Sequence, residues 1–405
     1  MNASDLSRSP DYQNQWTTLL MLFMIHVLTA IGMYSIAPLI PLIKQELALN
    51  HTQVGMLSGA FFLGVGLTSA VAGWAIDLLG VRKMILWGTL LLSGSLAAVA
   101  CFPLYAAMLL LFVMAGIGYC VVTPSTNKAV MYWFSENIRA TAMGIKQTGL
   151  NAGGFLAGII LPPLALAFNW RWALLASGFI AAGALVFILF LFKKNSSGAL
   201  FIPIAQWLKK FKIVISERNI LLLSAESFFR VGVQMAFFTY LVLFLQRVLN
   251  FNLVLSSFLF AVAQASGAMG RIAWGVISDR IFYGRRKFVY LLIGLVAMLI
   301  FFLMGLMTPD TSFWLVLTIV GCLGFTAAGH QGVSLTLLGE AVGTDLTGTA
   351  TGLGQSLSFL GAVLASPGFG LIVDTYGKFS YAWSGLAILS LLCCVILCFV
   401  HEKTK

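Results

Sequence analysis

Long apolar runs occupy almost the whole chain and leave few choices of fold. Of the 405 residues, 60% are hydrophobic and only 9% are charged, a composition foreign to soluble domains of this length. A helix that crosses a bilayer needs roughly 20 apolar residues, so the chain has room for about twelve such spans joined by short loops. The sequence therefore predicts an all-α membrane protein with twelve transmembrane helices.

Hydrophilic segments divide these spans into units. We expect a cytoplasmic tail over residues 1–15, a first six-helix half over 16–192, a cytoplasmic linker over 193–218, a second six-helix half over 219–400 and a cytoplasmic tail over 401–405. The first fifteen residues are polar, and the apolar run that follows them is too long for the core of a cleavable signal peptide. We therefore expect no cleaved leader.

The linker carries a basic cluster. Lys209, Lys210 and Lys212 lie beside Trp207 and Phe211. Basic residues next to aromatic ones are typical of a short amphipathic helix on the anionic inner leaflet. We predict such a surface helix between the two halves.

The distribution of Lys and Arg predicts the orientation of the spans. With the N-terminus inside, 16 of the 24 Lys and Arg fall on the cytoplasmic side, four fall within spans, and four fall outside: Lys44, Arg171, Arg247 and Lys378. This is the positive-inside bias of membrane proteins. We expect both termini in the cytosol and the chain in a bacterial plasma (inner) membrane. The same bias accounts for the net charge of +11 without a nucleic-acid partner.

One short polar turn occurs twice. The first copy is Gly73-Trp74-Ala75-Ile76-Asp77-Leu78-Leu79-Gly80-Val81-Arg82-Lys83, and the second runs from Gly275 through Asp279 to Gly284-Arg285-Arg286-Lys287. Glycine permits close helix approach and chain reversal, and aspartate and arginine can pair at the membrane surface to hold helices in one of two arrangements. We predict a conformational-switch loop made of Gly73, Asp77, Gly80, Arg82 and Lys83 in the first copy and Gly275, Asp279, Arg280 and Arg285 in the second.

This turn resembles the loop signature of the major facilitator superfamily, G-x-x-x-D-x-x-G-x-R-[KR], between the second and third helices of those transporters. The spans repeat as well, because the following pairs each lie 208 residues apart: Gly116 and Gly324, Gly144 and Gly352, Gln147 and Gln355, Gly153 and Gly361. The resemblance covers essentially the whole chain. It implies two pseudo-symmetric six-helix halves, with the solute between them near the middle of the membrane. The alternative is a generic positive-inside turn.

Five charged residues lie inside predicted spans, where a charge is costly and is therefore a candidate functional group. Four are cations, Arg230, Arg271, Lys128 and Lys146, and one is a carboxylate, Glu226. A cation at about 4 Å is worth several kcal/mol to an anion in a partly desolvated cavity. We therefore expect an anionic solute.

Arg271 lies eight residues before Asp279, which places it about 12 Å inside the inner surface on a helix. A guanidinium there can hold a carboxylate with two parallel hydrogen bonds. The spacing Arg271-x-x-x-Gly275-x-x-x-Asp279 resembles the eighth helix of the oxalate:formate antiporter, and its first part resembles monocarboxylate transporters. The resemblance implies that Arg271 belongs to an anion site. The alternative is that Arg271 snorkels to the cytosol or braces the nearby turn.

Glu226 and Arg230 lie four residues apart on one helix face, with Gln234 one turn further along. One interpretation is a mutual ion pair that lowers the cost of inserting both groups. The other is that Glu226 is a protonatable partner in proton coupling. His26 and His330 are also candidates for proton coupling because histidine titrates near neutral pH, although each can equally be a packing hydrogen-bond donor.

Lys128 and Lys146 enter the membrane on either side of an expected loop, Ser135–Arg139. They face one another across the cavity in one interpretation and snorkel to the surface in the other. The segment Pro124-x-x-Asn127-Lys128-x-x-x-x-Trp133-Phe134, followed by Arg139 and Gly144-x-x-Gln147-x-Gly149, resembles helices 4 and 5 of bacterial organic-anion carriers in this superfamily. The predicted substrate-binding residues are therefore Arg271, Arg230, Lys128, Lys146, Gln147, Asn127, Gln355 and Gln264.

Three classes of function were weighed. The leading hypothesis is a secondary active transporter of a small organic anion, a carboxylate first, that works by alternating access and is coupled to protons or to a counter-transported anion. The alternative is a proton-driven multidrug efflux antiporter, although the fifth span has Gly153-Gly154 where such exporters typically have Gly-Pro. A membrane enzyme or sensor is the third, but no nucleophile–base constellation or phosphate loop is visible.

The remaining expectations concern partners. The six cysteines lie in or beside apolar runs without metal-ligand spacing, so we expect neither a metal nor a disulfide. We also expect no cofactor, and a monomer embedded in the lipid bilayer.

Overall fold

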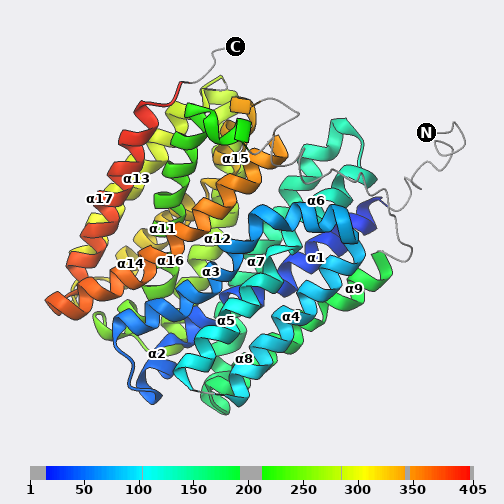
Figure 1. Cartoon of the computed structure of the whole chain (residues 1–405). Coiled ribbons are helices and arrows are strands. Elements are labelled where there is room, and N and C mark those ends of the chain that lie inside the picture. The colour runs from blue at the N-terminus through cyan, green and yellow to red at the C-terminus, as the bar shows by residue number, and fades with distance from the viewer. Residues whose placement is uncertain (1–14, 103, 192–211, 284, 343–346, 402–405) are drawn as a thin grey trace, which may run out of the picture.

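The computed structural model describes residues 15–102, 104–191, 212–283, 285–342 and 347–401. These residues contain helices and no strand, and twelve of the helices are long and apolar enough to cross a membrane. The predicted all-α fold with twelve transmembrane helices is confirmed. The helices form two bundles that meet along the middle of the molecule (Figure 1).

The first six spans are drawn from blue to green in Figure 1. In chain order their helices are α1 (Gln15–Tyr34) and α2 (Ile36–Glu46), α3 (His51–Leu79), α4 (Val81–Cys101), α5 (Tyr105–Cys120) and α6 (Val122–Trp133), α7 (Glu136–Ala167), and α8 (Trp170–Ala182) and α9 (Ala184–Leu191). Three of these spans are each divided into two helices by a local break.

The last six spans continue from green to red. Their helices are α11 (Arg218–Arg247), α12 (Leu253–Val276) with the π-helix η3 (Ile277–Ile281), α13 (Arg286–Gly305), α14 (Phe313–Leu323) with the π-helix η4 (Gly324–Ala328) and α15 (Gln331–Val342), α16 (Thr347–Tyr376) and α17 (Phe379–Cys398). The linker lies mostly outside the described residues, so the expected surface helix is described only over residues 212–216, which are helical.

Twelve spans are an even number, so the chain enters and leaves the bundle at the same end, at the upper right of Figure 1. We call this end the tail side. The opposite end, which carries the connections between α2 and α3 and between α16 and α17, is the far side. Lys44, Arg171, Arg247 and Lys378, the four cations expected outside, all lie in or beside the far-side turns of their helices.

The first span bends where its prolines predict. Pro38 and Pro41 have no N–H to donate to the carbonyls four residues earlier, so the helix cannot continue unchanged through this stretch. Helix α1 ends at Tyr34 and α2 begins at Ile36. The hydroxyl of Ser35 at the break donates to the carbonyl of Gly32 at 2.8 Å.

Two expected turns differ from the structure. The loop expected over Ser135–Arg139 is shorter, because α7 begins at Glu136 and includes Arg139. The second copy of the polar turn also begins later than the first. Helix α3 ends against Gly80, which has a φ of 86°, whereas the equivalent position 202 residues on is Phe282. Without a glycine there the helix continues, and Asp279 and Arg280 lie in its last turn, η3.

The glycines that recur between the halves have equivalent packing. A Cβ on Gly116 would overlap the carbonyl oxygen of Phe61, and a Cβ on Gly324 would overlap that of Ala263, which lies 202 residues after Phe61. Glycine at both positions therefore lets two backbones touch. Gly144 and Gly352, by contrast, both have open space around the Cβ position. The sequence repeat is thus matched by a repeat of helix contacts.

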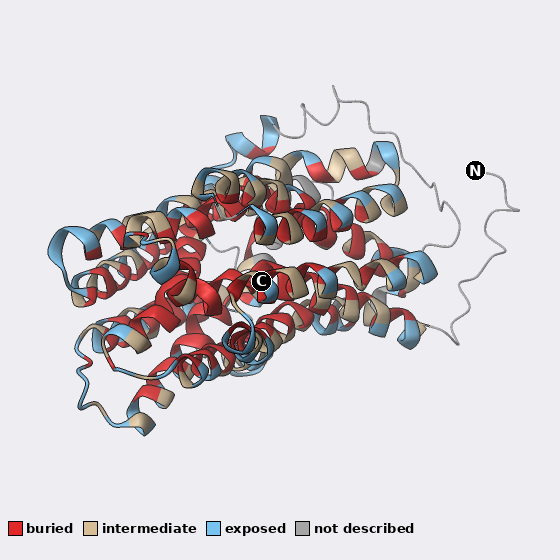
Figure 2. Cartoon of the chain, turned by 90° about the horizontal axis from the view of Figure 1, so that it is seen from below, coloured by how far each residue is buried: buried red, intermediate tan, exposed pale blue. Residues whose placement is uncertain are grey.

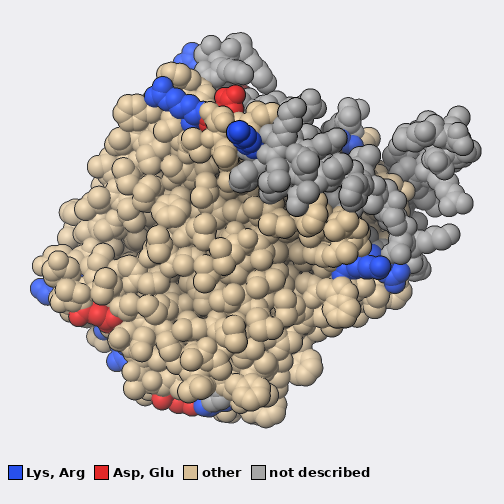
Figure 3. Space-filling model, in the orientation of Figure 1, with Lys and Arg blue, Asp and Glu red and all other residues tan. Residues whose placement is uncertain are grey.

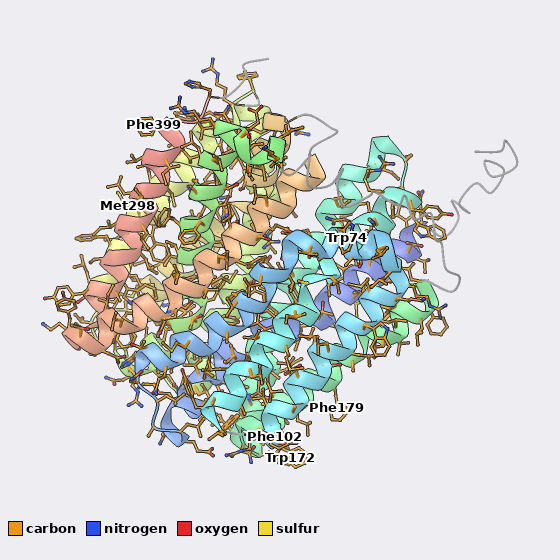
Figure 4. The ribbon with its side chains drawn as sticks, in the orientation of Figure 1. Trp74, Phe102, Trp172, Phe179, Met298 and Phe399 are labelled. Atoms are coloured by element: carbon orange, nitrogen blue, oxygen red, sulfur yellow. The ribbon has the colours of Figure 1, made fainter. Side chains whose placement is uncertain are left out.

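The outer faces of the bundle are apolar. Buried residues follow the inner faces of the helices and exposed ones the outer faces (Figure 2). Figure 3 shows a broad band without charged side chains between two charged ends. Aromatic residues lie near both ends, with Phe399 on the tail side and Phe102 and Trp172 on the far side (Figure 4). Such a belt is typical of a lipid boundary, and the chain is a multi-pass membrane protein.

The halves meet mainly through two helix pairs, α3 with α16 and α7 with α12. Along the first pair, a Cβ on Gly55 would meet the carbonyl of Ser366, and one on Gly59 would meet the carbonyl of Val363. Further toward the tail side, Gly66 faces the side chain of Leu360. The α3–α16 contact is therefore largely backbone against backbone.

Candidate functional site

A cavity of about 90 Å³ lies between the two halves. Its walls come from α1, α3, α5, α6 and α7 of the first half and from α11, α15 and α16 of the second. The polar wall includes Gln147, Gln355, His330 and Gln331. Gln147 and Gln355 are partners in the sequence repeat, so each half supplies one amide to the cavity. The structure brings these two predicted residues together.

Arg271 lies directly behind this wall. It belongs to α12, and its side chain is only 8% exposed. Its Nη1 donates to the carbonyl of Gln147 at 3.3 Å, and its Nε donates to the carbonyl of Ala328 at 3.4 Å. Its Nη2 is buried without a partner. Because Gln147 belongs to the first half, Arg271 bridges the two halves next to the cavity.

The charge of Arg271 is not balanced by the protein around it. Among the described residues, no carboxylate lies within ion-pair distance of its guanidinium. Two carbonyl oxygens satisfy part of its donor capacity, and leaving a buried donor unsatisfied costs about 1–3 kcal/mol. The arrangement leaves one face of the fork available to an anion that reaches this wall.

Lys146 forms a second buried cationic cluster, within the first half. Its side chain is fully buried, and its Nζ donates to Thr126 Oγ1 at 3.1 Å and to Asn127 Oδ1. His26 Nε2 lies 2.8 Å from the same Thr126 hydroxyl, and His26 Nδ1 is buried without a partner. A single hydroxyl thus joins the lysine to the histidine. As with Arg271, no described carboxylate lies within ion-pair distance of Lys146.

The two predicted lysines have different surroundings. Lys128 is half-buried on α6, whereas Lys146 points from α7 into the contact between α6 and α1. Neither belongs to the wall of the central cavity as the structure shows it. Lys146 does not reach the surface, so the snorkelling interpretation is wrong for this residue.

Arg230 is neutralised by its own helix. Its Nε pairs with Glu226 Oε1, which confirms the predicted ion pair between residues four apart. Tyr290 of α13 donates its hydroxyl to Glu226 Oε2 at 2.7 Å, and its ring lies 4.2 Å from the Arg230 guanidinium carbon. His330 stacks on the other side of this group, with its ring centroid 6.0 Å from that of Tyr290. His330 therefore connects the cluster to the cavity.

Gln264 joins the halves on the far side of Arg271. It is fully buried on α12, and its backbone carbonyl accepts from Asn151 Nδ2 of α7 at 3.1 Å. The same amide nitrogen lies 3.3 Å from Gln264 Oε1. Gln264 is thus an interface residue between α7 and α12 and not part of the cavity wall.

The predicted switch loops lie on the tail side. Arg286 Nη1 pairs with Asp279 Oδ1 at 3.2 Å, within the second half. In the first copy, Arg82 and Lys83 occupy the first turn of α4, directly after Gly80. The side chain of Asp77 lies outside the described residues.

Sequence reasoning missed one polar contact between the halves. Asp374, near the far-side end of α16, accepts hydrogen bonds from the first two residues of α3. The capping sequence Asn50-x-x-Gln53 indicates a helix start there. A lone aspartate at a helix end, however, gives no signal of a partner 322 residues away. Tyr290 was also missed, since a tyrosine in an apolar run is normally a packing residue.

Comparison with known proteins agrees with this architecture. The sequence profile of the Major Facilitator Superfamily matches residues 22–366. The hexuronate transporter of Bacillus subtilis (strain 168) is 24% identical over 92% of both chains. The phosphoglycerate transporter protein of Salmonella typhimurium (strain LT2) is 22% identical over 90% of this chain and 83% of its own length.

A solved structure of the nucleoside transporter NupG superposes with a TM-score of 0.78, at 16% identity, over 95% of this chain and all of that one. At this identity the superposition shows the shared fold alone. The profile match, which covers most of the chain, shows the family. The chain belongs to the Major Facilitator Superfamily, and it is a transmembrane transporter and not an enzyme.

Proposed function

We propose that this transporter carries a small organic anion, a carboxylate in the first instance, by alternating access. The solute binds between the halves, in contact with Gln147 and Gln355, and the guanidinium of Arg271 balances its charge. Transport is coupled to protons or to exchange of a second anion, because importing an anion against an inside-negative potential requires one of them.

The observation that carries this proposal is the state of Arg271. Its guanidinium is buried at the junction of the halves, contacts the backbone of a cavity residue and has an unpartnered Nη2. A buried charge without a counter-ion is expensive, so its retention is best explained by a ligand of opposite sign. Lys146 adds a second unbalanced cation to the same region.

The relatives support the same sign of charge. Hexuronate and phosphoglycerate, for which two of them are named, are carboxylates. The cationic wall also argues against a cationic drug as solute, because the same charges would repel it. The proposal therefore favours anion transport over the multidrug efflux alternative.

The Glu226 cluster is the proposed place of proton coupling. Glu226 is fully buried and held by Arg230 and Tyr290, while His330 stacks on Tyr290 and lines the cavity. A proton can reach Glu226 from the cavity only past these aromatic and imidazole rings. His26, which shares Thr126 with Lys146, is a second candidate.

The orientation follows from the charges at the two ends. The tail side carries the basic clusters and the far side carries four cations, so we assign the tail side to the cytosol of a bacterial inner membrane. Transport is a property of one chain in this proposal, since both walls of the cavity belong to the same polypeptide.

Arg271→Ala tests the proposal. Purified protein in proteoliposomes is assayed for uptake of labelled hexuronate, glycerate and other carboxylates. We expect wild type to transport at least one of them and Arg271→Ala to lose at least about tenfold in initial rate at limiting solute, equivalent to about 1.4 kcal/mol. Arg271→Lys keeps the charge but not the fork, and we expect an intermediate rate.

The matched control is Arg247→Ala, which removes an exposed arginine from the far-side end of α11. It should transport as wild type does. Equal transport by wild type and Arg271→Ala would overturn the assignment of the site. Transport of cationic dyes in place of carboxylates would instead favour the efflux alternative.

A further inference from the structure

The far side of the molecule is held closed by one carboxylate. Asp374 Oδ1 accepts from the backbone N–H of His51 at 3.0 Å and lies 2.6 Å from His51 Nδ1. Its Oδ2 accepts from the backbone N–H of Thr52 at 2.8 Å and from the Thr52 hydroxyl at 2.7 Å. Both oxygens are therefore engaged, and every one of these contacts joins the second half to the first.

The N-terminus of α3 suits this role. Its first backbone N–H groups have no partner within the helix, and the helix dipole adds positive potential at this end. Asn50 and Gln53 form a reciprocal capping box, so the helix start is held in place before Asp374 reaches it. The carboxylate completes the cap from the opposite half.

A second contact reinforces the closure. Tyr240 of α11 donates its hydroxyl to the carbonyl of His51 at 2.6 Å, and its ring stacks on Phe369 of α16 at 4.4 Å between centroids. His51 is thus held by both of its backbone groups to residues of the second half. The imidazole of His51 also contacts the ring of Phe379 edge-on, at 5.4 Å.

The charged contacts described on the tail side are of another kind. Arg286 pairs with Asp279, Lys287 Nζ donates to the carbonyls of Cys398 and Val400, and Arg139 donates to the carbonyl of Phe134. Each of these joins residues of the same half. The polar contacts named on the far side tie the halves together, whereas those named on the tail side stiffen each half separately.

We propose that Asp374 is the far-side latch of the transport cycle: its bonds to His51 and Thr52 hold the far side closed in the state seen here and must break before the solute path opens to that side. The strength of this latch then sets the balance between the two states of the carrier. The inference rests on alternating access, which is part of the proposed function, and not on the charge of the solute.

The latch is tested by measuring distances across both ends of the protein. Spin labels are attached at Phe168→Cys and Trp314→Cys on the far side, which are 68% and 72% exposed in the structure. A second pair, Tyr132→Cys and Tyr283→Cys, reports on the tail side. The six native cysteines are replaced beforehand, and pulsed electron paramagnetic resonance is recorded in lipid without solute.

Asp374→Asn removes the charge and puts an NH2 group against N–H donors. We expect the ratio of far-side-closed to far-side-open molecules to fall by about tenfold, as for the loss of two or more hydrogen bonds to a charged acceptor. Far-side distances then lengthen while tail-side distances shorten. Thr52→Val, which removes only the hydroxyl bond, should shift both distances in the same direction by less.

The matched control is Asp310→Asn, which makes the same change at an exposed far-side carboxylate between α13 and α14. Its distances should equal those of wild type. The latch is rejected if folded, monodisperse Asp374→Asn shows wild-type distances, or if both ends lengthen together, because that pattern reports loosened packing. Since no solute is present, failure here leaves the anion proposal standing, and loss of anion transport leaves the latch standing.

Discussion

The buried cations of this transporter differ in what surrounds them. Arg230 has a carboxylate on its own helix and a tyrosine ring against its guanidinium, whereas Arg271 has only carbonyl oxygens. The sequence predicted the first pair because residues four apart share a helix face. It could not show that Arg271 lacks a counter-ion, because that depends on side chains from α7 and η4 that are remote in the chain.

The Glu226–Arg230 pair leads to a prediction about stability. Glu226→Gln leaves the Arg230 charge buried without a counter-ion, and breaking a buried pair costs about 3–5 kcal/mol. We expect a marked fall in the melting temperature of the purified protein. The double variant Glu226→Gln/Arg230→Gln removes both charges and should regain part of the loss. A single variant as stable as wild type would mean that the pair is not structural.

The same variant separates the two interpretations of Glu226. If Glu226 only neutralises Arg230, the double variant regains proton-driven uptake together with its stability. If Glu226 carries the coupled proton, both variants retain solute exchange between labelled and unlabelled pools but lose uptake driven by a proton gradient. Comparing exchange with gradient-driven uptake in the same proteoliposomes decides between these outcomes.

At the scale of helices, the positions of the spans could be predicted and their interruptions could not. Length and apolarity locate each span, and Pro38 and Pro41 indicate the first bend. The π-helices η3 and η4 carry no comparable signal, since they arise where a helix absorbs an extra residue under packing constraints. The start of α7 was misjudged because Ser135 caps the helix directly after the extended residue Phe134.

Two glycines of α16 test the packing of this helix. A Cβ on Gly361 would overlap the carbonyl oxygen of Phe228 in α11, while a Cβ on Gly352 would meet nothing within 4 Å. We expect Gly361→Ala to destabilise the protein by about 1–3 kcal/mol or more, because backbone must move. Gly352→Ala should be neutral or slightly stabilising, since alanine favours a helix by about 1 kcal/mol. Thermal unfolding of the two purified variants gives the comparison; equal melting temperatures would contradict it.

For the whole molecule, the repeat and the charge bias predicted two halves and an orientation, and the contacts between the halves were beyond the sequence. The repeated glycines have equivalent neighbours in each half, so divergence of the two halves has spared their internal packing. The Asp374 latch has no counterpart signal in the sequence because it depends on how one half sits against the other.

The assigned orientation predicts which residues are accessible from outside a cell. A cysteine at Asp310 on the far side should react with a membrane-impermeant maleimide in intact cells. A cysteine at Tyr283 on the tail side, which is 89% exposed, should react only after the membrane is permeabilised. Both are introduced singly in a background without native cysteines. The reverse pattern of labelling would invert the assignment of the two sides.

The glycine-lined crossing of α3 and α16 bears on how fast the halves can change places. At Gly55 and Gly59 the two helices present smooth main chain to one another, without interlocked side chains that would have to change rotamer. A surface of this kind behaves as a low-friction bearing: it resists separation through close van der Waals contact yet offers few steps to a sliding or rolling displacement. The slow events of the cycle should then arise at the polar fastenings at either end of the crossing, and the crossing itself should set the axis of rotation.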